Sequence, residues 1–167
     1  MTQTEIMQMF NSTEELLTKY LDEDVRTIFS TMVGMEISAS QSVATETTFK
    51  DSVTAMVGFA GSYSGLICII CKRKLALDIT AQMLGMDVTK CNDNVHDALG
   101  EIANMIAGSF KHNFVLEGHE AQLSTPSLIS GEQYDITVGP LHDTLTLMFE
   151  YARASNFFVS VYLKAGN

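Results

Sequence analysis

Residues 92–117, NDNVHDALGEIANMIAGSFKHNFVLE, constrain the fold most, because they predict one long helix with two unlike faces. At 3.6 residues per turn the apolar side chains gather on one face. That face consists of Val95, Leu99, Ile102, Ala103, Ile106 and Phe110. The opposite side is a narrow polar stripe made of Asp97, Glu101, Asn104, Gly108 and Lys111. The sequence therefore predicts a central helix that buries one side in a core and presents a polar stripe on the other.

The polar stripe contains two like charges that destabilise the helix, and a face that is only solvated does not require them. Asp97 and Glu101 are like charges four residues apart, which destabilises a helix by about 0.2–0.5 kcal/mol. Asp97 regains part of this from the helix dipole near the N-terminus. Two plainer interpretations stay open: Asp97 as the third helical residue after an Asn94 cap, and Glu101 with Asn104 as ordinary solvated side chains.

The rest of the chain alternates between helical and strand-like patterns. One further helix is expected from a capping box at Ser12 and Glu15 to Gly34, and another over residues 72–84, ended by Gly85. Expected strands are 52–59 and 65–71, joined as a hairpin, then 120–124, 142–149 and 157–164, with a short strand considered near 43–49. Residues 131–140 are expected to form a loop.

This order of elements predicts an α+β fold, with a largely antiparallel sheet covered by helices. No linker or low-complexity tract divides the 167 residues, so we expect a single domain over 1–167, with 1–11 as a loose N-terminal segment or a short helix.

Charge and hydropathy narrow the class of partner. Ten Lys and Arg against twenty Asp and Glu give a formal charge of −10, which disfavours nucleic acid and anionic membranes. The longest apolar stretch, around residues 66–70, is far shorter than the ~20 residues of a membrane span. The first residues lack the pattern of a secretory signal. We therefore expect a cytoplasmic protein whose partner offers a basic surface.

Common catalytic and metal-binding patterns do not occur. Cys68 and Cys71 form a lone C-x-x-C within a predicted strand, where they point to opposite faces, so buried thiols are favoured over a redox or metal pair. The four histidines have no spacing that puts two imidazoles on one helix face. No G-x-S-x-G elbow is present either. We therefore expect no metal or cofactor of the protein's own.

Glu101 and Asn104, one helical turn apart, are the remaining candidates for chemistry. A neutral Asn carboxamide cannot accept a proton, but its donors and acceptor can hold a water molecule in line with an electrophile. The neighbouring Glu could act as a base, bind a metal or pair with a partner's Lys. Such a pair suits hydrolysis of a phosphoryl group that another protein has already activated, where positioning of water is most of what remains.

At these residues the sequence resembles the chemotaxis phosphatases of the CheC, CheX and FliY type. Their pattern is Asp or Ser, three residues, Glu, two residues, Asn, and Pro about twenty-one residues later. Asp97, Glu101, Asn104 and Pro126 match it, with 21 residues between Asn104 and Pro126. The segments DALGEIANMIAG, STPSLISG and AQMLGMD also look like family segments.

The resemblance implies a CheC/CheX-like fold and a role in hydrolysing the aspartyl phosphate of a phosphorylated CheY-like response regulator. By position, Asn104 would orient the attacking water and Glu101 would pair with the regulator's active-site Lys, while Asp97 and Pro126 would shape the site. The Mg²⁺ would belong to the response regulator. Because the chain has one motif where CheC-like members have two, CheX is the nearer relative, and CheX-like members usually form homodimers through sheet edges.

Three further residues are candidates for contact with the partner. Gly108 costs about 1 kcal/mol relative to Ala inside a helix, so close approach of a backbone is expected there, from a partner or from a neighbour within the fold. Met105 is expected near a partner surface, and Lys111 is more simply surface charge. The alternative function is a non-catalytic adaptor of the same fold that sequesters a response regulator or motor component. A free-standing metal hydrolase lacks the ligand spacing.

Overall fold

The computed structural model describes residues 3–116, 118–139, 142–152 and 155–165. The helical elements are α1 (Gln3–Ile28), the π-helical turn η1 (Phe29–Val33), α2 (Arg73–Leu84) and α3 (Asp93–Leu116). The strands are β1 (Gln41–Val43), β2 (Thr48–Gly61), β3 (Tyr63–Lys72), β4 (Ala121–Leu123), β5 (Ser127–Asp135), β6 (Asp143–Tyr151) and β7 (Ser155–Ala165).

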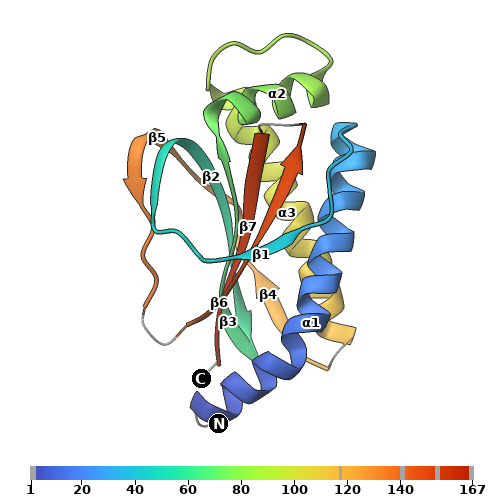
Figure 1. Cartoon of the computed structure of the whole chain (residues 1–167), viewed down its shortest axis with the longest axis vertical. Helices are drawn as coiled ribbons and strands as arrows, with labels where there is room; N and C mark the ends of the chain where they lie inside the picture. The colour runs from blue at the N-terminus through green and yellow to red at the C-terminus, as the bar shows by residue number, and fades with distance from the viewer. Residues whose placement is uncertain (1–2, 117, 140–141, 153–154, 166–167) are drawn as a thin grey trace.

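Within the described residues, seven strands form one antiparallel sheet in the order β1-β6-β7-β3-β2-β4, and β5 also pairs with β2. Helices α1 and α3 lie alongside one another against one face of the sheet, and α2 lies across one end (Figure 1). The predicted α+β class, with an antiparallel sheet covered by helices, is confirmed.

The main core lies between this sheet and the helices. Every residue of the predicted apolar face of α3 is at most 2% exposed: Val95, Leu99, Ile102, Ala103, Ile106 and Phe110. On the α1 side, the ring of Phe157 stacks between those of Phe29 and Phe149, with centroid distances of 4.6 and 5.2 Å. Burial of large apolar side chains of this kind contributes roughly 1.5–3 kcal/mol each, so α3 is fixed in rotation by its apolar face.

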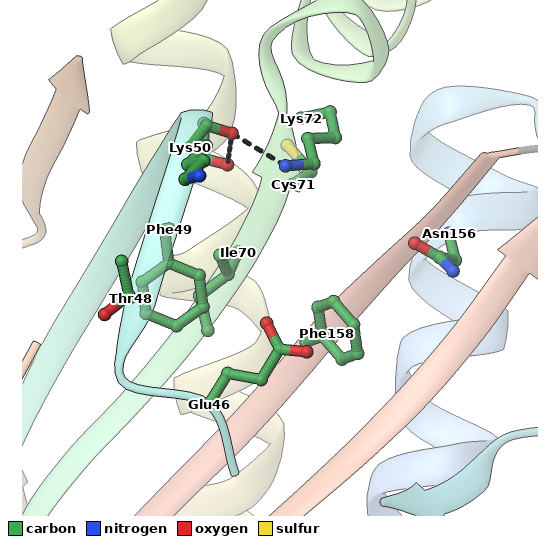
Figure 2. Close-up of a pocket in the computed structure, with 10 residues that line it drawn as sticks. Glu46, Thr48, Phe49, Lys50, Ile70, Cys71, Lys72, Asn156 and Phe158 are labelled. Carbon is green, nitrogen blue, oxygen red and sulfur yellow. Dashed lines mark hydrogen bonds between the residues drawn. The ribbon is translucent and has the colours of Figure 1, made fainter. Parts of the chain in front are cut away.

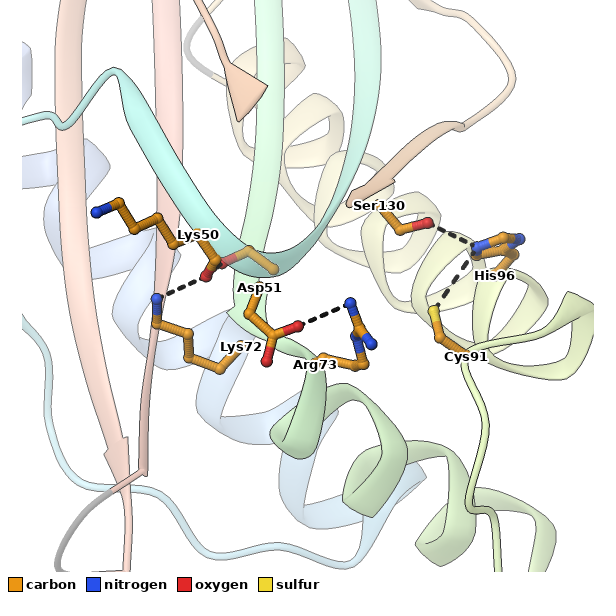
Figure 3. Close-up of polar contacts among 8 residues, drawn as sticks. Lys50, Asp51, Lys72, Arg73, Cys91, His96 and Ser130 are labelled. Atoms are coloured by element: carbon orange, nitrogen blue, oxygen red, sulfur yellow. Dashed lines mark hydrogen bonds and ion pairs between the residues drawn. The ribbon is translucent and has the colours of Figure 1, made fainter. Parts of the chain in front are cut away.

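A second, smaller core lies beside a bend in β2, on the sheet face that α1 and α3 leave uncovered. Asp51 has a φ of 46°; β2 pairs with β5 on both sides of this residue, whereas its pairing with β3 starts at Ser52. The bend is held by an Asp51–Arg73 ion pair of 2.7 Å and by Lys72 Nζ, which donates to the Lys50 carbonyl at 2.7 Å (Figure 3). The residues of this core are Phe49, Cys68, Ile70, Ile136 and Tyr162.

Two sequence-based predictions about the elements are wrong. The first helix begins at Gln3, so Ser12 lies inside it and is no cap; it ends through the π-turn and Gly34, whose φ is 78°. Residues 131–135, predicted as loop, belong to β5 and pair with β2. The segment considered as a strand near 43–49 divides between the end of β1 and the start of β2. Glu117 and Pro140 lie outside the described residues.

Candidate functional site

The polar stripe is carried by α3, whose start is defined by Asn92. The Asn92 side-chain oxygen accepts from the Asn94 amide at 3.0 Å, and its carbonyl accepts from the amides of Val95 and His96. An Asn at this position is a favoured helix cap. The predicted Asn94 cap is therefore wrong, and Asp97 lies too far into the helix to bond back as a capping-box residue.

Glu101 and Asn104 are both exposed on the same side of α3, one turn apart, and Asp97 is exposed one turn before them. Ile102 and Ala103, which lie between them in sequence, are 0% and 1% exposed. The buried face thus holds the helix in place while the two polar side chains stay free to meet a partner.

Pro126 lies on one flank of the stripe, beside the residue that precedes Glu101. A Cβ added at Gly100 would lie 3.7 Å from the Pro126 Cβ and 3.5 Å from Leu128 Cδ2, so the backbone of α3 comes close to this turn. The turn is anchored by Ser124, whose hydroxyl accepts from the Gly58 amide and whose own amide donates to the Gly58 carbonyl, both at 2.9 Å. Asp97, Glu101 and Asn104 are thus exposed along one side of α3, and Pro126 lies beside Gly100 at the edge of that side.

A hollow of about 360 Å³ lies on the other flank, between α3 and α1. Its lining residues are Asp24, Met105, Gly108, Ser109, His112 and Asn113. Asn113 Nδ2 donates to Asp24 Oδ2 at 2.7 Å, and burial raises the pKa of the Asp24 carboxyl despite this hydrogen bond. Met105 is half-buried and packs on the core as well as lining the hollow.

Lys111 stands apart from the rest of the stripe. It lines a different hollow, formed with Glu120 and Gln122 near the ends of β2 and β4. The structure therefore does not place it with Pro126 or with the hollow beside Gly108.

Sequence reasoning missed several residues around the stripe. Gly100 faces Pro126, where an added Cβ would be in ordinary van der Waals contact, and the only signal in the sequence is a small residue directly before Glu101. Asp24 contributes from a distant helix, which the sequence gives no means to place. His96 joins α3 to β5, because its Nε2 lies 3.4 Å from Ser130 Oγ and also 3.9 Å from Cys91 Sγ (Figure 3).

Cys68 and Cys71 are buried free thiols, as predicted, and Cys91 is a half-buried free thiol. Burial raises the pKa of the Cys68 and Cys71 thiols to about 12, which keeps them protonated at neutral pH. In the part of the chain that the structure describes, no three His, Cys, Asp or Glu side chains are grouped so that they could hold a metal ion. No described helix is long and apolar enough to cross a bilayer.

A separate cavity of about 310 Å³ lies beside the bend in β2. Phe49, Ile70 and Phe158 form its apolar surface and the Glu46 side chain points toward Phe158 (Figure 2). Its lining residues come from the sheet and from Glu46, and α3 contributes none of those described. It is therefore not part of the surface that carries Glu101 and Asn104.

Comparison with known proteins gives both family and fold. The profile described as "Chemotaxis phosphatase CheX" matches residues 53–150, more than half of the chain and including the whole of α3 and Pro126. No curated protein matches the chain in sequence.

Solved structures of chemotaxis proteins share the fold. A CheX from Desulfovibrio desulfuricans superposes with a TM-score of 0.79 at 26% identity, covering 89% of this chain and 99% of its own. A CheC-like chemotactic protein from Shewanella oneidensis gives 0.74 at 27% identity, covering 87% and 96%. The CheX of a CheX-CheY-BeF₃-Mg²⁺ complex from Borrelia burgdorferi gives 0.72 at 18% identity, covering 87% and 96%, and shows the fold alone.

The fold and the exposed polar stripe thus define a chemotaxis protein of the CheC and CheX type. Within that class, this chain belongs to the CheX family of chemotaxis phosphatases.

Proposed function

We propose that this protein hydrolyses the aspartyl phosphate of a CheY-like response regulator and so ends a chemotaxis-type signal in the cytoplasm. The observation that carries the proposal is the exposure of Glu101 and Asn104 on one side of a helix whose other side is fully buried. The family match adds weight, as does the Borrelia complex, in which a CheX of this fold is paired with CheY.

In the proposed reaction Asn104 holds the attacking water. Its carboxamide accepts a hydrogen bond from the water and can donate to an oxygen nearby, which aligns the water with the phosphorus atom. The water oxygen forms a bond to phosphorus as the bond to the Asp carboxylate oxygen breaks, giving inorganic phosphate and a free Asp. Asn104 takes no proton, so the water proton passes to phosphate or solvent.

Glu101 is proposed to pair with the Lys of the receiver's active site. A carboxylate and an ammonium form a charge-assisted hydrogen bond about twice as strong as a neutral one, which would fix α3 against the receiver. The receiver's own Mg²⁺ would neutralise charge on the phosphoryl oxygens. Asp97 and Pro126 border the stripe and are proposed to shape it.

The test is the rate of phosphate loss from a phosphorylated receiver domain. Asn104→Ala should reduce the acceleration at least about 100-fold, because misplacement of the nucleophile by 1 Å already costs about that much. It should still bind the receiver. An adaptor would instead bind tightly while the wild-type protein leaves the decay rate unchanged.

A further inference from the structure

Gly108 occupies a position where the fold itself does not require glycine. It lies one turn beyond Asn104 on the same stripe, and a Cβ added there would meet no atom within 4 Å. Glycine inside a helix costs about 1 kcal/mol relative to Ala. Since nothing described in the chain fills the space, no neighbour within the fold explains this glycine.

The space over Gly108 is continuous with the hollow between α1 and α3. This hollow has a carboxylate on its α1 side, because Asp24 is half-buried there and bonded to Asn113 through one oxygen. The nearby Arg26 is paired with Asp22 at 3.3 Å. Of the residues that the structure describes, no Lys or Arg lines the hollow. His112 is the titratable group that faces Asp24 from α3, and Glu23 on α1 adds a second negative charge.

The hollow lies close enough to Asn104 to fall beneath a docked receiver. Gly108 follows Asn104 by four residues, about 6 Å along the helix axis, whereas a stable protein interface covers roughly 800 Å² on each partner. An interface of that size centred on Asn104 would therefore include the hollow.

We propose that this hollow receives a basic side chain of the phosphorylated receiver domain, and that Gly108 lets the segment bearing it approach the backbone of α3. The inference rests on the proposed function, because that function identifies the partner. The ammonium or guanidinium group pairs with the Asp24 carboxylate, and the side-chain stem lies over Gly108 and against Met105. The overall charge of −10 favours approach of a basic surface.

The experiment measures binding to receiver domains of the same organism loaded with beryllofluoride, and separately measures turnover of the phosphorylated form. Gly108→Leu fills the hollow and should weaken binding at least ten-fold.

Asp24→Asn keeps the shape of the side chain and the hydrogen-bond partner of Asn113 but removes the negative charge. It should weaken binding several-fold at low salt and reduce the dependence of binding on salt. Glu150→Gln is the matched control, since it removes one exposed charge on β6 from a side chain that points away from the core side of its neighbour Phe149, and it should leave binding unchanged.

Loss of folding does not confound Gly108→Leu. Leu is a better helix former than Gly and meets open space here, so the melting temperature of Gly108→Leu should not fall. Wild-type affinity in folded Gly108→Leu would overturn the inference. Weaker binding by Gly108→Leu together with unchanged binding by Asp24→Asn would contradict the proposal that a basic side chain occupies the hollow. If both variants weaken binding as expected but the wild-type protein does not hydrolyse the aspartyl phosphate of the receiver, the proposed function is wrong and the docking inference still holds.

Discussion

Glu101 and Asn104 are exposed polar residues on a helix that owes its position to other residues. Among the described contacts neither makes a side-chain hydrogen bond or ion pair within the chain, so neither is tied to the fold. We propose that they serve a partner, to which they offer a carboxylate and a carboxamide held one turn apart on a rigid element. A site on a helix is held more precisely than one on a loop.

The Thr54 and Tyr134 pair gives a prediction about stability. Thr54 is 0% exposed, and its hydroxyl lies 2.8 Å from the Tyr134 hydroxyl. Tyr134→Phe should destabilise the protein by about 1–3 kcal/mol, because it leaves the buried Thr54 hydroxyl without this partner. In denaturant unfolding, the double variant with Thr54→Val should cost less than the sum of the single variants. Additive effects would show that the hydrogen bond contributes little.

The buried thiols give a prediction about pH. In the unfolded chain a thiol has a pKa of about 8.5, whereas burial raises the pKa of Cys68 and Cys71 to about 12. The folded state thus keeps these protons longer. Their contribution to stability is fully present at pH values below the pKa of the thiol in the unfolded chain. It is lost as the pH rises from that pKa toward the pKa in the folded state.

The melting temperature under reducing conditions should accordingly fall from about pH 8.5 upward, and it should fall less steeply in Cys68→Ala. Tyr134 and Tyr162, whose pKa values burial also raises, contribute to the same trend at higher pH. A slope identical in both proteins would contradict a role for the Cys68 thiol.

The buried face and the exposed face of α3 should differ in how much a substitution changes the free energy of unfolding. Leu99 is 0% exposed in the core, so Leu99→Ala should cost about 2–5 kcal/mol of unfolding free energy through lost burial and the cavity left behind. Glu101→Ala, two residues away, should change it by less than about 0.5 kcal/mol. Denaturant titration followed by circular dichroism checks both. A large destabilisation by Glu101→Ala would make Glu101 a structural residue.

Elements with a clear period could be predicted from the sequence, and those without one could not. The burial of α3 followed from its 3.6-residue repeat, and the β2–β3 hairpin followed from β-prone runs around turn residues. β5 was missed in part because its side chains are half-buried or exposed, so its backbone pairing with β2 leaves no alternation to detect. Element boundaries such as the Asn92 cap depend on local hydrogen bonds that several neighbouring Asn and Asp residues could supply.

The candidate site likewise has parts that could be predicted from the sequence and parts that could not. The stripe of Glu101 and Asn104 is a local property of one helix and could be predicted. The approach of Pro126 to Gly100 and the contribution of Asp24 from α1 depend on packing between distant segments, which no local pattern encodes. The β2 bend at Asp51, with its positive φ, is likewise set by contacts with Arg73 that lie outside the strand pattern.

At the scale of the whole molecule, the helices and the uncovered sheet face define two different surfaces. The helical side carries Glu101, Asn104 and the hollow at Gly108, whereas the cavity near Phe49 opens beside the bend (Figure 2). The sheet ends at β1 on one side and at β4 and β5 on the other. These edges leave backbone groups available for pairing with a second chain.

We propose that the protein forms a homodimer through such a sheet edge, which leaves the α3 stripe of each chain free. Light scattering coupled to gel filtration should give twice the mass of one chain, and Glu101→Ala should not change it. A mass equal to a single chain at micromolar concentration would contradict the dimer and leave the proposed reaction untouched.

The most direct test of the central claim is the decay of phosphate on receiver domains from the same organism, with and without catalytic amounts of this protein. The wild-type protein should accelerate decay of one of them over many turnovers. Asn104→Ala should bind that receiver yet lose the acceleration, with an unchanged melting temperature. Acceleration that survives in Asn104→Ala would contradict a water-positioning role for Asn104, and tight binding without acceleration by the wild-type protein would contradict the phosphatase itself.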